Sequence, residues 1–552
     1  MDARMGKVTE HGGEAHPAET ESNKLLNKNP SNPSTTKCER NGKVSTKSRT
    51  ILWHAAFWGF AINYMARCNL NLAIVSIVVP KRVSTNSLTK PLECFNMSSN
   101  FPVGNSTDHY QYGDEMRKYF SLERIVMDLF MIDYNKNGFE WTEYEQGQCL
   151  GSFYWLFWST QLLGGYLANR FGTKLVFGLS NFLSCGLSFL IPTAAYLNFK
   201  FLLIVRMLQG ALSGFSFPAM HHITSQWIPP NERSRFISAY MGCSVGVAIC
   251  YPIFGFIISI SSWEWTFHFC SVATVVWFIF WQYCVYDSPA DHPRIESSEL
   301  NYITKALGST SQKDKKAPIP WTSIFKSIPF WITVCASWGS VWQLYTLMIQ
   351  LPTYFKFIHG FDIRMSGLFS GGPHFLRMGF SYIFSSFVDY LLHSKSLSRT
   401  NARKVAVFVS CIFSGSLCIG LAYAGCNSNL VIVLTTASIA LLGAQSAGTL
   451  PSFVELASNY SSILLGISQT ICVLPGILSS HIVGVLTNNQ QTREQWKYVF
   501  LITAGMSILS GLVFVLFSSS DEQSWNKSSK SVEMKPLNES KCVEIPREKC
   551  SE

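Results

Sequence analysis

The sequence predicts an all-α membrane protein with twelve transmembrane helices arranged as two six-helix halves. Of its 552 residues 47% are hydrophobic and only 14% are charged, whereas about a quarter of the residues of soluble proteins are charged. Apolar segments long enough to span a bilayer recur along the chain. The polar segment 287–327, rich in Lys and Pro, divides them six and six, and such duplication is typical of membrane transport proteins.

The expected elements follow in order. The N-terminal half, 51–286, contains spans at 51–79, 147–168, 174–196, 199–226, 236–260 and 265–286. The C-terminal half, 328–518, contains spans at 328–354, 365–391, 403–424, 429–450, 461–486 and 497–518. The polar tails 1–50 and 519–552 are expected to be disordered, because they hold too few apolar residues to form a core.

Basic residues indicate which side of the membrane each loop faces. The turns after spans two, four and eight are rich in Lys and Arg, as is the segment 287–327, and the alternate turns are poorer. By the positive-inside rule, both tails and this segment face the cytosol. The net charge of +10 is therefore interpreted as topology, and no nucleic-acid partner is expected.

The long loop 81–146 falls on the opposite, non-cytosolic side. It contains two N-glycosylation sequons, at Asn96 and Asn105, and we expect both to be modified because glycosylation occurs on that side. The sequons at Asn526 and Asn538 lie in the cytosolic tail and are expected to stay unmodified.

The 16 cysteines are scattered through the chain. Their spacing matches neither a disulfide framework nor a zinc site, so we expect them to pack as small apolar side chains. The stretch 133–138 imitates the start of a calcium-binding loop, but the twelfth position of that loop is Tyr144 instead of Glu. No metal site is expected.

Two arginines lie inside apolar spans, Arg67 in the first and Arg206 in the fourth. A guanidinium in the bilayer core costs roughly 2.5–3.5 kcal/mol on insertion scales, so its default interpretation is functional. Both can bind a carboxylate or phosphate bidentately. The alternative for each is a snorkelling or structural arginine. Gly210 and Gly214 share a helix face and should allow another helix to approach closely.

The segment Gly165-Tyr-Leu-Ala-Asn169-Arg170-Phe-Gly172-Thr-Lys174 joins spans two and three. It resembles the signature loop of the major facilitator superfamily, in which an acid usually occupies the position of Asn169. The glycines permit a tight turn. The alternative is an ordinary basic cytosolic turn. A remnant of the same motif in the second half is Asp389, at the end of span eight.

Further motifs resemble one branch of that superfamily, which contains sialin, the vesicular glutamate transporters and the sodium–phosphate cotransporters. They include Arg67-Cys-Asn-Leu-Asn-Leu-Ala-Ile-Val75, Arg206-Met-Leu-Gln-Gly210 and Trp227-Ile-Pro-Pro-Asn-Glu232-Arg233-Ser-Arg235. The resemblance covers about 51–518 except the long loop. It implies twelve helices around a central cavity and the transport of anions, with Arg67 and Arg206 as the residues that bind substrate.

Other candidates for the cavity lining are Tyr64, Gln343, Tyr345, His374 and Arg377, and the alternative for the first four is packing or interhelical hydrogen bonding. The chain also departs from the branch pattern. Ser213, Leu150 and Ser340 stand where glutamate-type members carry an acid, a histidine and an arginine, respectively. The remaining candidates for coupling to an ion gradient are His221 and Glu455. Capping of a helix is the alternative for His221.

Glu21, Leu25 and Leu26 resemble an acidic dileucine sorting signal read by an adaptor, and a disordered polar tail with two leucines is the alternative. The expected location is a lysosomal or vesicular membrane, or else the plasma membrane.

The sequence thus predicts a secondary active transporter of organic or inorganic anions such as sialate, acidic amino acids or phosphate, working by alternating access as a monomer in the lipid bilayer. H⁺ and Na⁺ are the candidate coupling ions. No nucleotide-binding loop is visible, so neither a cofactor nor enzyme activity is expected. The alternatives are a sodium- or potential-driven phosphate carrier and a non-transporting sensor or scaffold that retains the fold.

Overall fold

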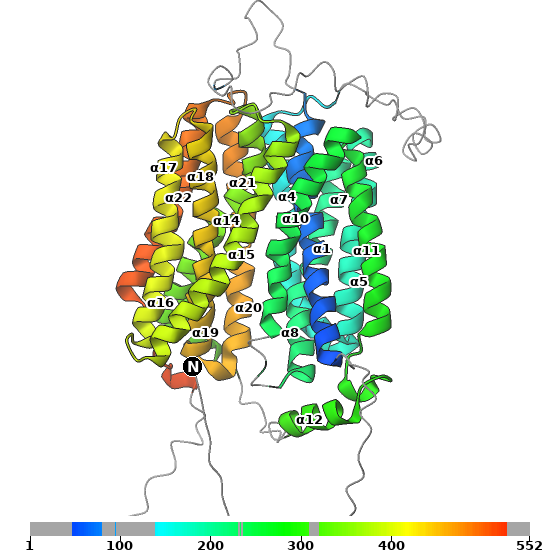
Figure 1. Ribbon diagram of the computed structural model, residues 1–552, viewed down its shortest axis with the longest axis vertical. Coiled ribbons are helices and arrows are strands. Elements are labelled where there is room, and N and C mark those ends of the chain that lie inside the picture. Colours follow the sequence, from blue (N-terminus) through cyan, green and yellow to red (C-terminus); the bar gives the residue numbers. More distant parts are fainter. Residues whose placement is uncertain are drawn as a thin grey trace, which may run out of the picture. The chain divides into compact units, whose positions relative to one another are not determined.

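The structure is a computed structural model that describes residues 47–79, 94, 138–229, 232, 236–308 and 319–526. These residues belong to one compact unit, and within it they form helices and a single isolated bridge between Val78 and Phe139 (Figure 1). Several residues singled out in the sequence lie outside the described residues: Glu21, Leu25, Leu26, Asn96, Asn105, Arg233, Arg235 and Asn538.

The N-terminal half follows the expected order of spans. Its helices are α1 (Ser48–Ile77), α4 (Glu143–Phe171), α5 (Thr173–Gly186), η1 (Leu187–Leu190), α6 (Ile191–Leu197), α7 (Phe199–Ser213), α8 (Ser216–Trp227), η3 (Ser238–Met241), α10 (Gly242–Ile260) and α11 (Glu264–Cys284). Adjoining helices join into single spans, so that α5, η1 and α6 form the third span and α7 with α8 forms the fourth.

Three short helices connect the halves: η4 (Pro289–Asp291), α12 (Ser297–Gly308) and α13 (Trp321–Lys326). The C-terminal half then comprises α14 (Ile328–Phe357), α15 (Ile363–His393), α16 (Arg399–Val407), η5 (Phe408–Phe413), α17 (Ser414–Tyr423), α18 (Ser428–Leu441), η6 (Leu442–Ala447), α19 (Thr449–Leu456), η7 (Ser458–Tyr460), α20 (Ser461–Cys472), α21 (Leu474–Thr487) and α22 (Arg493–Phe517), and η8 (Ser524–Asn526) follows. The predicted twelve-helix fold in two halves is confirmed, and helix ends differ from expectation by a few residues.

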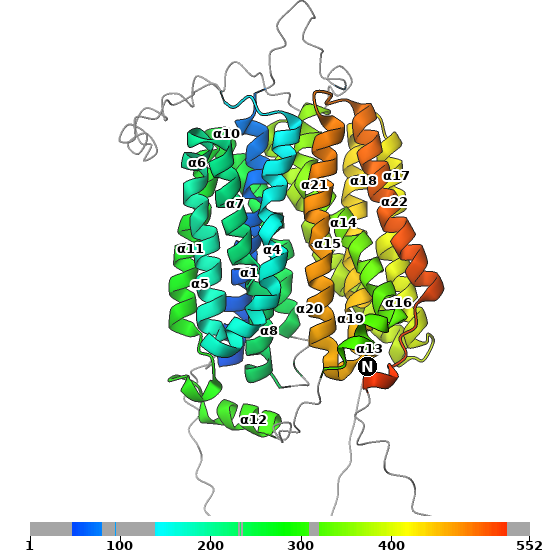
Figure 2. The ribbon, with the colours of Figure 1, turned by 180° about the vertical axis from the view of Figure 1, so that it is seen from behind.

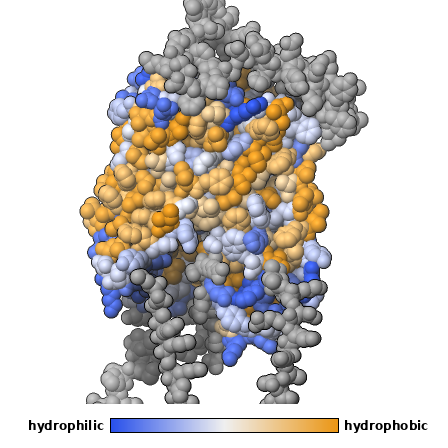
Figure 3. Space-filling view, viewed as in Figure 1, coloured by the Kyte–Doolittle hydropathy of each residue, from blue (hydrophilic) through white to orange (hydrophobic). Residues whose placement is uncertain are grey.

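Eight of the spans in the described part are long and apolar enough to be identified as membrane-crossing by length and hydropathy alone. The other four spans are α1, α4, α14 and α15. They carry more polar residues, and many of these are buried, such as Asn63 in α1, Ser152 in α4 and Gln343 in α14. A polar residue in a span normally faces the interior of the bundle, which is where these buried polar side chains lie. Figure 3 shows hydrophobic residues across the middle of the visible face and hydrophilic residues toward both ends.

The two halves are in close contact near the end that carries the 78–139 connection. A Cβ on Gly147 of α4 would lie 3.0 Å from the Cα of Gly484 of α21, and one on Gly367 of α15 would lie 3.4 Å from the Cα of Gly255 of α10. Figure 2 shows α4 beside α21. A small, partly open pocket lies next to the first contact, lined by residues that include Gln146 and Gln350.

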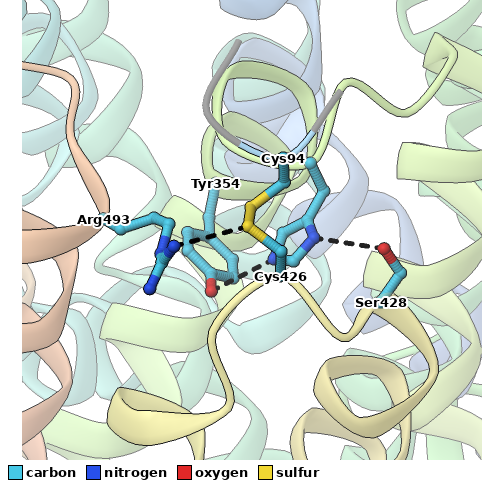
Figure 4. Close-up of a disulfide and its surroundings, with 6 residues drawn as sticks. Cys94, Tyr354, Cys426, Ser428 and Arg493 are labelled. Atoms are coloured by element: carbon cyan, nitrogen blue, oxygen red, sulfur yellow. Dashed lines mark hydrogen bonds between the residues drawn. A yellow bond between two sulfur atoms is a disulfide. The ribbon is translucent and has the colours of Figure 1, made fainter. Parts of the chain in front are cut away.

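A disulfide links Cys94, in the connection between α1 and α4, to Cys426, between α17 and α18 (Figure 4). It joins the two halves covalently, and it corrects the expectation that every cysteine would be unpaired. The two residues are 332 positions apart in the sequence, and pairing over such a distance cannot be deduced from spacing. The other cysteines of the described part are free, and most are buried as expected.

Candidate substrate-binding site

Arg67 lies in the second half of α1 and is surrounded by aromatic rings. The centroids of Tyr64 and Phe157 are 4.4 and 4.5 Å from its guanidinium carbon, and those of Phe153 and Tyr154 are 5.1 and 5.6 Å away. Tyr64 precedes Arg67 by one helical turn and so shares its face, and the other rings come from α4. The rings stabilise the buried cation through their negative faces, which allows an arginine that is only 2% exposed.

The guanidinium of Arg67 has unused hydrogen-bond donors. Its Nη1 donates to the hydroxyl of Tyr345, on α14 of the other half, at 3.3 Å. Its Nε and Nη2 are buried, and neither has a partner among the described residues. The described part also provides no carboxylate in an ion pair with Arg67. A buried charge without a counterion is costly, so this arrangement favours an anionic ligand.

Arg206, on α7, is fully buried and contacts the backbone of α1. It donates from Nη1 to the backbone oxygen of Ala66 at 3.3 Å and to Oε1 of Gln209 at 2.7 Å, and from Nη2 to the backbone oxygen of Arg67 at 3.4 Å. Arg206 therefore holds the backbone of α1 where the side chain of Arg67 begins.

Gly210 brings α7 against α4. A Cβ on Gly210 would lie 1.7 Å from the backbone oxygen of Phe153, and one on Gly214 would lie 2.6 Å from that of Phe157. The expected close helix approach is confirmed. It also sets the position of α4, which supplies three of the rings around Arg67.

Ser213, at the position of the missing acid, belongs to a neutral network. Its hydroxyl donates to Oδ1 of Asn63 at 2.9 Å, and Nδ2 of Asn63 donates to Oδ1 of Asn181 at 2.7 Å. Ser216 donates to the same Asn181 oxygen at 3.1 Å. All four residues are buried. No member carries a carboxylate or an imidazole, so this network does not titrate in the physiological range.

The remaining predicted lining residues divide into two groups. Tyr64 and Tyr345 contact Arg67 as described, and both also lie close enough to Arg377 on α15 to interact with it electrostatically. Gln343 points elsewhere: its Nε2 donates to Ser414 at 2.7 Å and to Ser438 at 2.8 Å, within the C-terminal half. The structure thus brings Tyr64 and Tyr345 to Arg67, places Arg377 near the same two tyrosines, and places Gln343 in an interhelical network.

The two candidate coupling residues lie in other surroundings. Nδ1 of His221 is 3.0 Å from the hydroxyl of Tyr240, and the histidine is exposed. Glu455 accepts hydrogen bonds from Nη2 and Nε of Arg403 at 2.7 and 3.1 Å. None of these hydrogen bonds involves Arg67 or Arg206, so His221 and Glu455 could affect the two arginines only indirectly.

Asp287, which follows α11, accepts a hydrogen bond at the turn between α4 and α5. Gly172 has a φ of +85°, a conformation that favours glycine. Oδ1 of Asp287 accepts from the backbone N–H of Lys174 at 2.7 Å, at the N-terminus of α5. The ammonium of Lys174 lies 4.2 Å from the ring centroid of Tyr286, and the guanidinium carbon of Arg170 lies 5.6 Å from that of Phe171.

The other motif residues lie at the same end of the N-terminal half. Glu232 forms an ion pair with Arg49 at the start of α1, and it accepts from the hydroxyl of Tyr302 on α12 at 3.1 Å. Arg49 is also paired with Glu299 of α12 at 2.9 Å. These bonds attach α12 to the N-terminal half. Gly165, Asn169 and Asp389 make no described side-chain hydrogen bond, and Asp389 is exposed.

Sequence reasoning missed the aromatic residues of α4, Gln209 and Asp287. The rings were hidden because this chain is rich in aromatic residues throughout. Asp287 follows directly after span six and was assigned to the polar connection.

The twelve spans form two halves. Between them lies Arg67, which is buried and has no ion-pair partner among the described residues. These features together define a membrane transport protein. The family model of the Major Facilitator Superfamily matches residues 121–480. Vesicular glutamate transporter 2 of Mus musculus is 31% identical, over 85% of this chain and 73% of its own length. Sialin of Homo sapiens is also 31% identical, over 87% of this chain and 91% of its own length.

Solved structures support the fold. A bacterial homologue of the human lysosomal transporter Spinster, in an inward-facing and unoccupied conformation, has a TM-score of 0.58 at 11% identity, over 86% of this chain and 97% of that one. A D-xylose–proton symporter has a TM-score of 0.56 at 14% identity, over 86% and 98%. The chain belongs to the major facilitator superfamily, in the branch of sialin and the vesicular glutamate transporters. It is a multi-pass membrane transporter and not an enzyme.

Proposed function

We propose that this protein is a secondary active transporter of organic or inorganic anions that works by alternating access between its two halves. The observation that carries this proposal is Arg67, whose Nε and Nη2 are buried without a partner among the described residues. An anion would accept both hydrogen bonds and neutralise the charge. The similarity to a vesicular glutamate transporter supports an anionic substrate.

The proposed cycle moves the binding site from one side of the membrane to the other. The glycine contacts between α4 and α21 and between α10 and α15 hold the halves together at one end. Hydrogen bonds join the halves at the same end, from Arg364 to Ser259 and from the backbone of Asn489 to Glu143. We infer that this state is closed on the non-cytosolic side and that separation of these contacts opens it.

For the driving force, we propose the membrane potential acting on the anion itself. Each charge that crosses is worth about 2.3 kcal/mol per 100 mV. The neutral network around Ser213 supports this choice, because a proton symporter needs a group in the cavity that titrates in each cycle. His221 and Glu455, with H⁺ or Na⁺, are the second candidates for coupling.

We propose that both tails face the cytosol and that the transporter lies in a lysosomal or vesicular membrane or in the plasma membrane. The Cys94–Cys426 disulfide supports this orientation, since disulfides persist in oxidising, non-cytosolic compartments. Asn526 is 2% exposed and its Oδ1 accepts from the backbone of Asn459, which fits an unmodified residue. Single Asn→Gln variants test the topology: Asn96 and Asn105 should each lose a glycosidase-sensitive shift, and Asn526 and Asn538 should not.

The function is tested by uptake into proteoliposomes of radiolabelled sialate, glutamate, aspartate, urate and phosphate, each assayed separately. A pH gradient with the potential clamped is compared with a potential at equal pH. We expect the potential alone to drive uptake of at least one anion, and Arg67→Ala to abolish it. Arg399→Ala, at an exposed position on α16, is the control. Uptake of no anion, with a correctly folded protein, would favour a sensor or scaffold instead.

A further inference from the structure

Arg377, halfway along α15, is a third arginine inside a span. It is partly exposed, and among the described residues its side chain forms no hydrogen bond or ion pair. It interacts electrostatically with Tyr64, Cys243 and Tyr345. The same three residues interact electrostatically with Arg67. Tyr64, Cys243 and Tyr345 are therefore close to both cations, and Arg67 and Arg377 come from different halves.

His374 adds an unused polar group beside Arg377. It precedes Arg377 by one turn of α15, so that both lie on the same side of the helix, and the two interact electrostatically. It is 1% exposed, and neither ring nitrogen has a partner among the described residues. An unpaired buried polar group is rare in folded proteins and calls for an explanation. A second anionic group bound by Arg377 would accept a hydrogen bond from this imidazole.

In the described part of the chain, the surroundings of Arg67 and Arg377 offer neither an ion-paired carboxylate nor a free aromatic face to bind an ammonium group. Among the described residues, neither Arg67 nor Arg377 forms an ion pair with a carboxylate. Aromatic faces are the other usual receptors for an ammonium group, but those of Tyr64, Phe153, Tyr154 and Phe157 already contact the guanidinium of Arg67. The two ends of the site are thus cationic, and nothing described between them is anionic.

We propose that the substrate is a dicarboxylate without an amino group, bound by Arg67 at one carboxylate and by Arg377 with His374 at the other. This inference rests on the proposed anion transport and specifies its substrate class. Tyr64 and Tyr345, which are close to both cations, would contact the middle of the ligand.

The test is ligand binding to the purified full-length protein in detergent, measured by thermal stabilisation over a concentration series. The probes are glutarate, the monocarboxylate valerate of equal chain length, and glutamate. We expect glutarate to bind about tenfold or more tightly than either of the others, since it alone offers two carboxylates and no ammonium. Glutarate binding equal to valerate binding would overturn the proposal.

The variants separate this inference from the proposed function. Arg377→Gln should weaken glutarate binding about tenfold and leave valerate binding within about twofold, and Arg377→Lys should retain part of the preference. Arg67→Gln should weaken both, and Arg399→Gln neither. If Arg377→Gln leaves the preference for glutarate unchanged while Arg67→Gln abolishes binding, the anion site stands and the dicarboxylate assignment fails. If Arg67→Gln also has no effect, the proposed function itself fails.

Discussion

The guanidinium of Arg206 donates a hydrogen bond to the backbone carbonyl oxygen of Arg67 at 3.4 Å. Two buried arginines that look equivalent in the sequence thus have different environments. Among the described residues, Arg67 leaves both Nε and Nη2 unpaired, whereas Arg206 leaves only Nε unpaired and uses Nη1 and Nη2 on the backbone of α1 and on Gln209. We interpret Arg67 as a substrate-binding residue and Arg206 as a positioning residue.

Substitution of the two arginines should have distinguishable effects. Arg67→Lys should raise KM for the transported anion about tenfold or more, because lysine lacks the planar fork of guanidinium donors, and leave thermal stability nearly unchanged. Arg206→Met should lower stability by about 1–3 kcal/mol, because Oε1 of Gln209 loses its partner. It should reduce the maximal rate more than KM, and Arg206→Lys should restore part of the stability. Equal rises in KM for both variants would place Arg206 in the substrate site.

Ser213→Glu should introduce a dependence on pH. The new carboxyl would enter the neutral network of Asn63 and Asn181, where burial favours its protonated form and charge would disturb the network. Uptake at clamped potential should therefore fall as the carboxyl ionises with rising pH. Ser213→Gln, which adds the same bulk without a titrating group, is the control. The account is wrong if the glutamine variant has the same pH profile as the glutamate variant.

Gly147→Val should prevent the close contact between α4 and α21. The added side chain would meet the backbone oxygen of Ser480, which lies only 2.6 Å from an ideal Cβ. The population should shift toward the state open at this end, and a cysteine introduced at Gln350, beside the contact, should react faster with a membrane-impermeant thiol reagent. Gly505→Val, where a Cβ has open space, should leave the labelling rate unchanged. Equal rates in the two variants would show that the contact does not limit access.

His359, in the turn between α14 and α15, should make stability depend on pH. It is 2% exposed, and its ring nitrogens lie 3.2 and 3.3 Å from the hydroxyls of Tyr354 and Ser428. Burial, with a smaller effect from Arg493, lowers the pKa of His359 to about 4, from about 6.5 in an unfolded chain.

The unfolded state therefore binds a proton near pH 6.5 that the folded state does not bind until about pH 4. Stability should be complete above about pH 6.5 and decrease as the pH falls toward 4, by at most about 3 kcal/mol from this group. Thermal unfolding from pH 4 to 8 measures it. His359→Gln should flatten the profile, and His393→Gln, at an exposed position, should not. An unchanged profile in His359→Gln would assign the acid sensitivity to other groups.

The fold could be predicted because membrane spans are set by the length and hydropathy of continuous segments. Arg67 could be predicted as a site residue because a buried charge is costly whatever its neighbours. The direction of individual side chains could not be predicted, because a span buried on most sides has no strong amphipathic period to orient it. The sequence therefore did not show that Gln343 donates a hydrogen bond within the C-terminal half or that Arg206 donates to backbone oxygens.

The Cys94–Cys426 disulfide gives the chain a second covalent route between its two halves. A single protease cut between residues 95 and 425 leaves two fragments, and each retains one cysteine of the bond. Such a nicked molecule migrates as one species on a non-reducing gel and separates only after a thiol is added. A cut between residues 79 and 93 releases the amino-terminal fragment, including α1, from any covalent attachment, so gel mobility alone reports on which side of Cys94 the chain was cleaved.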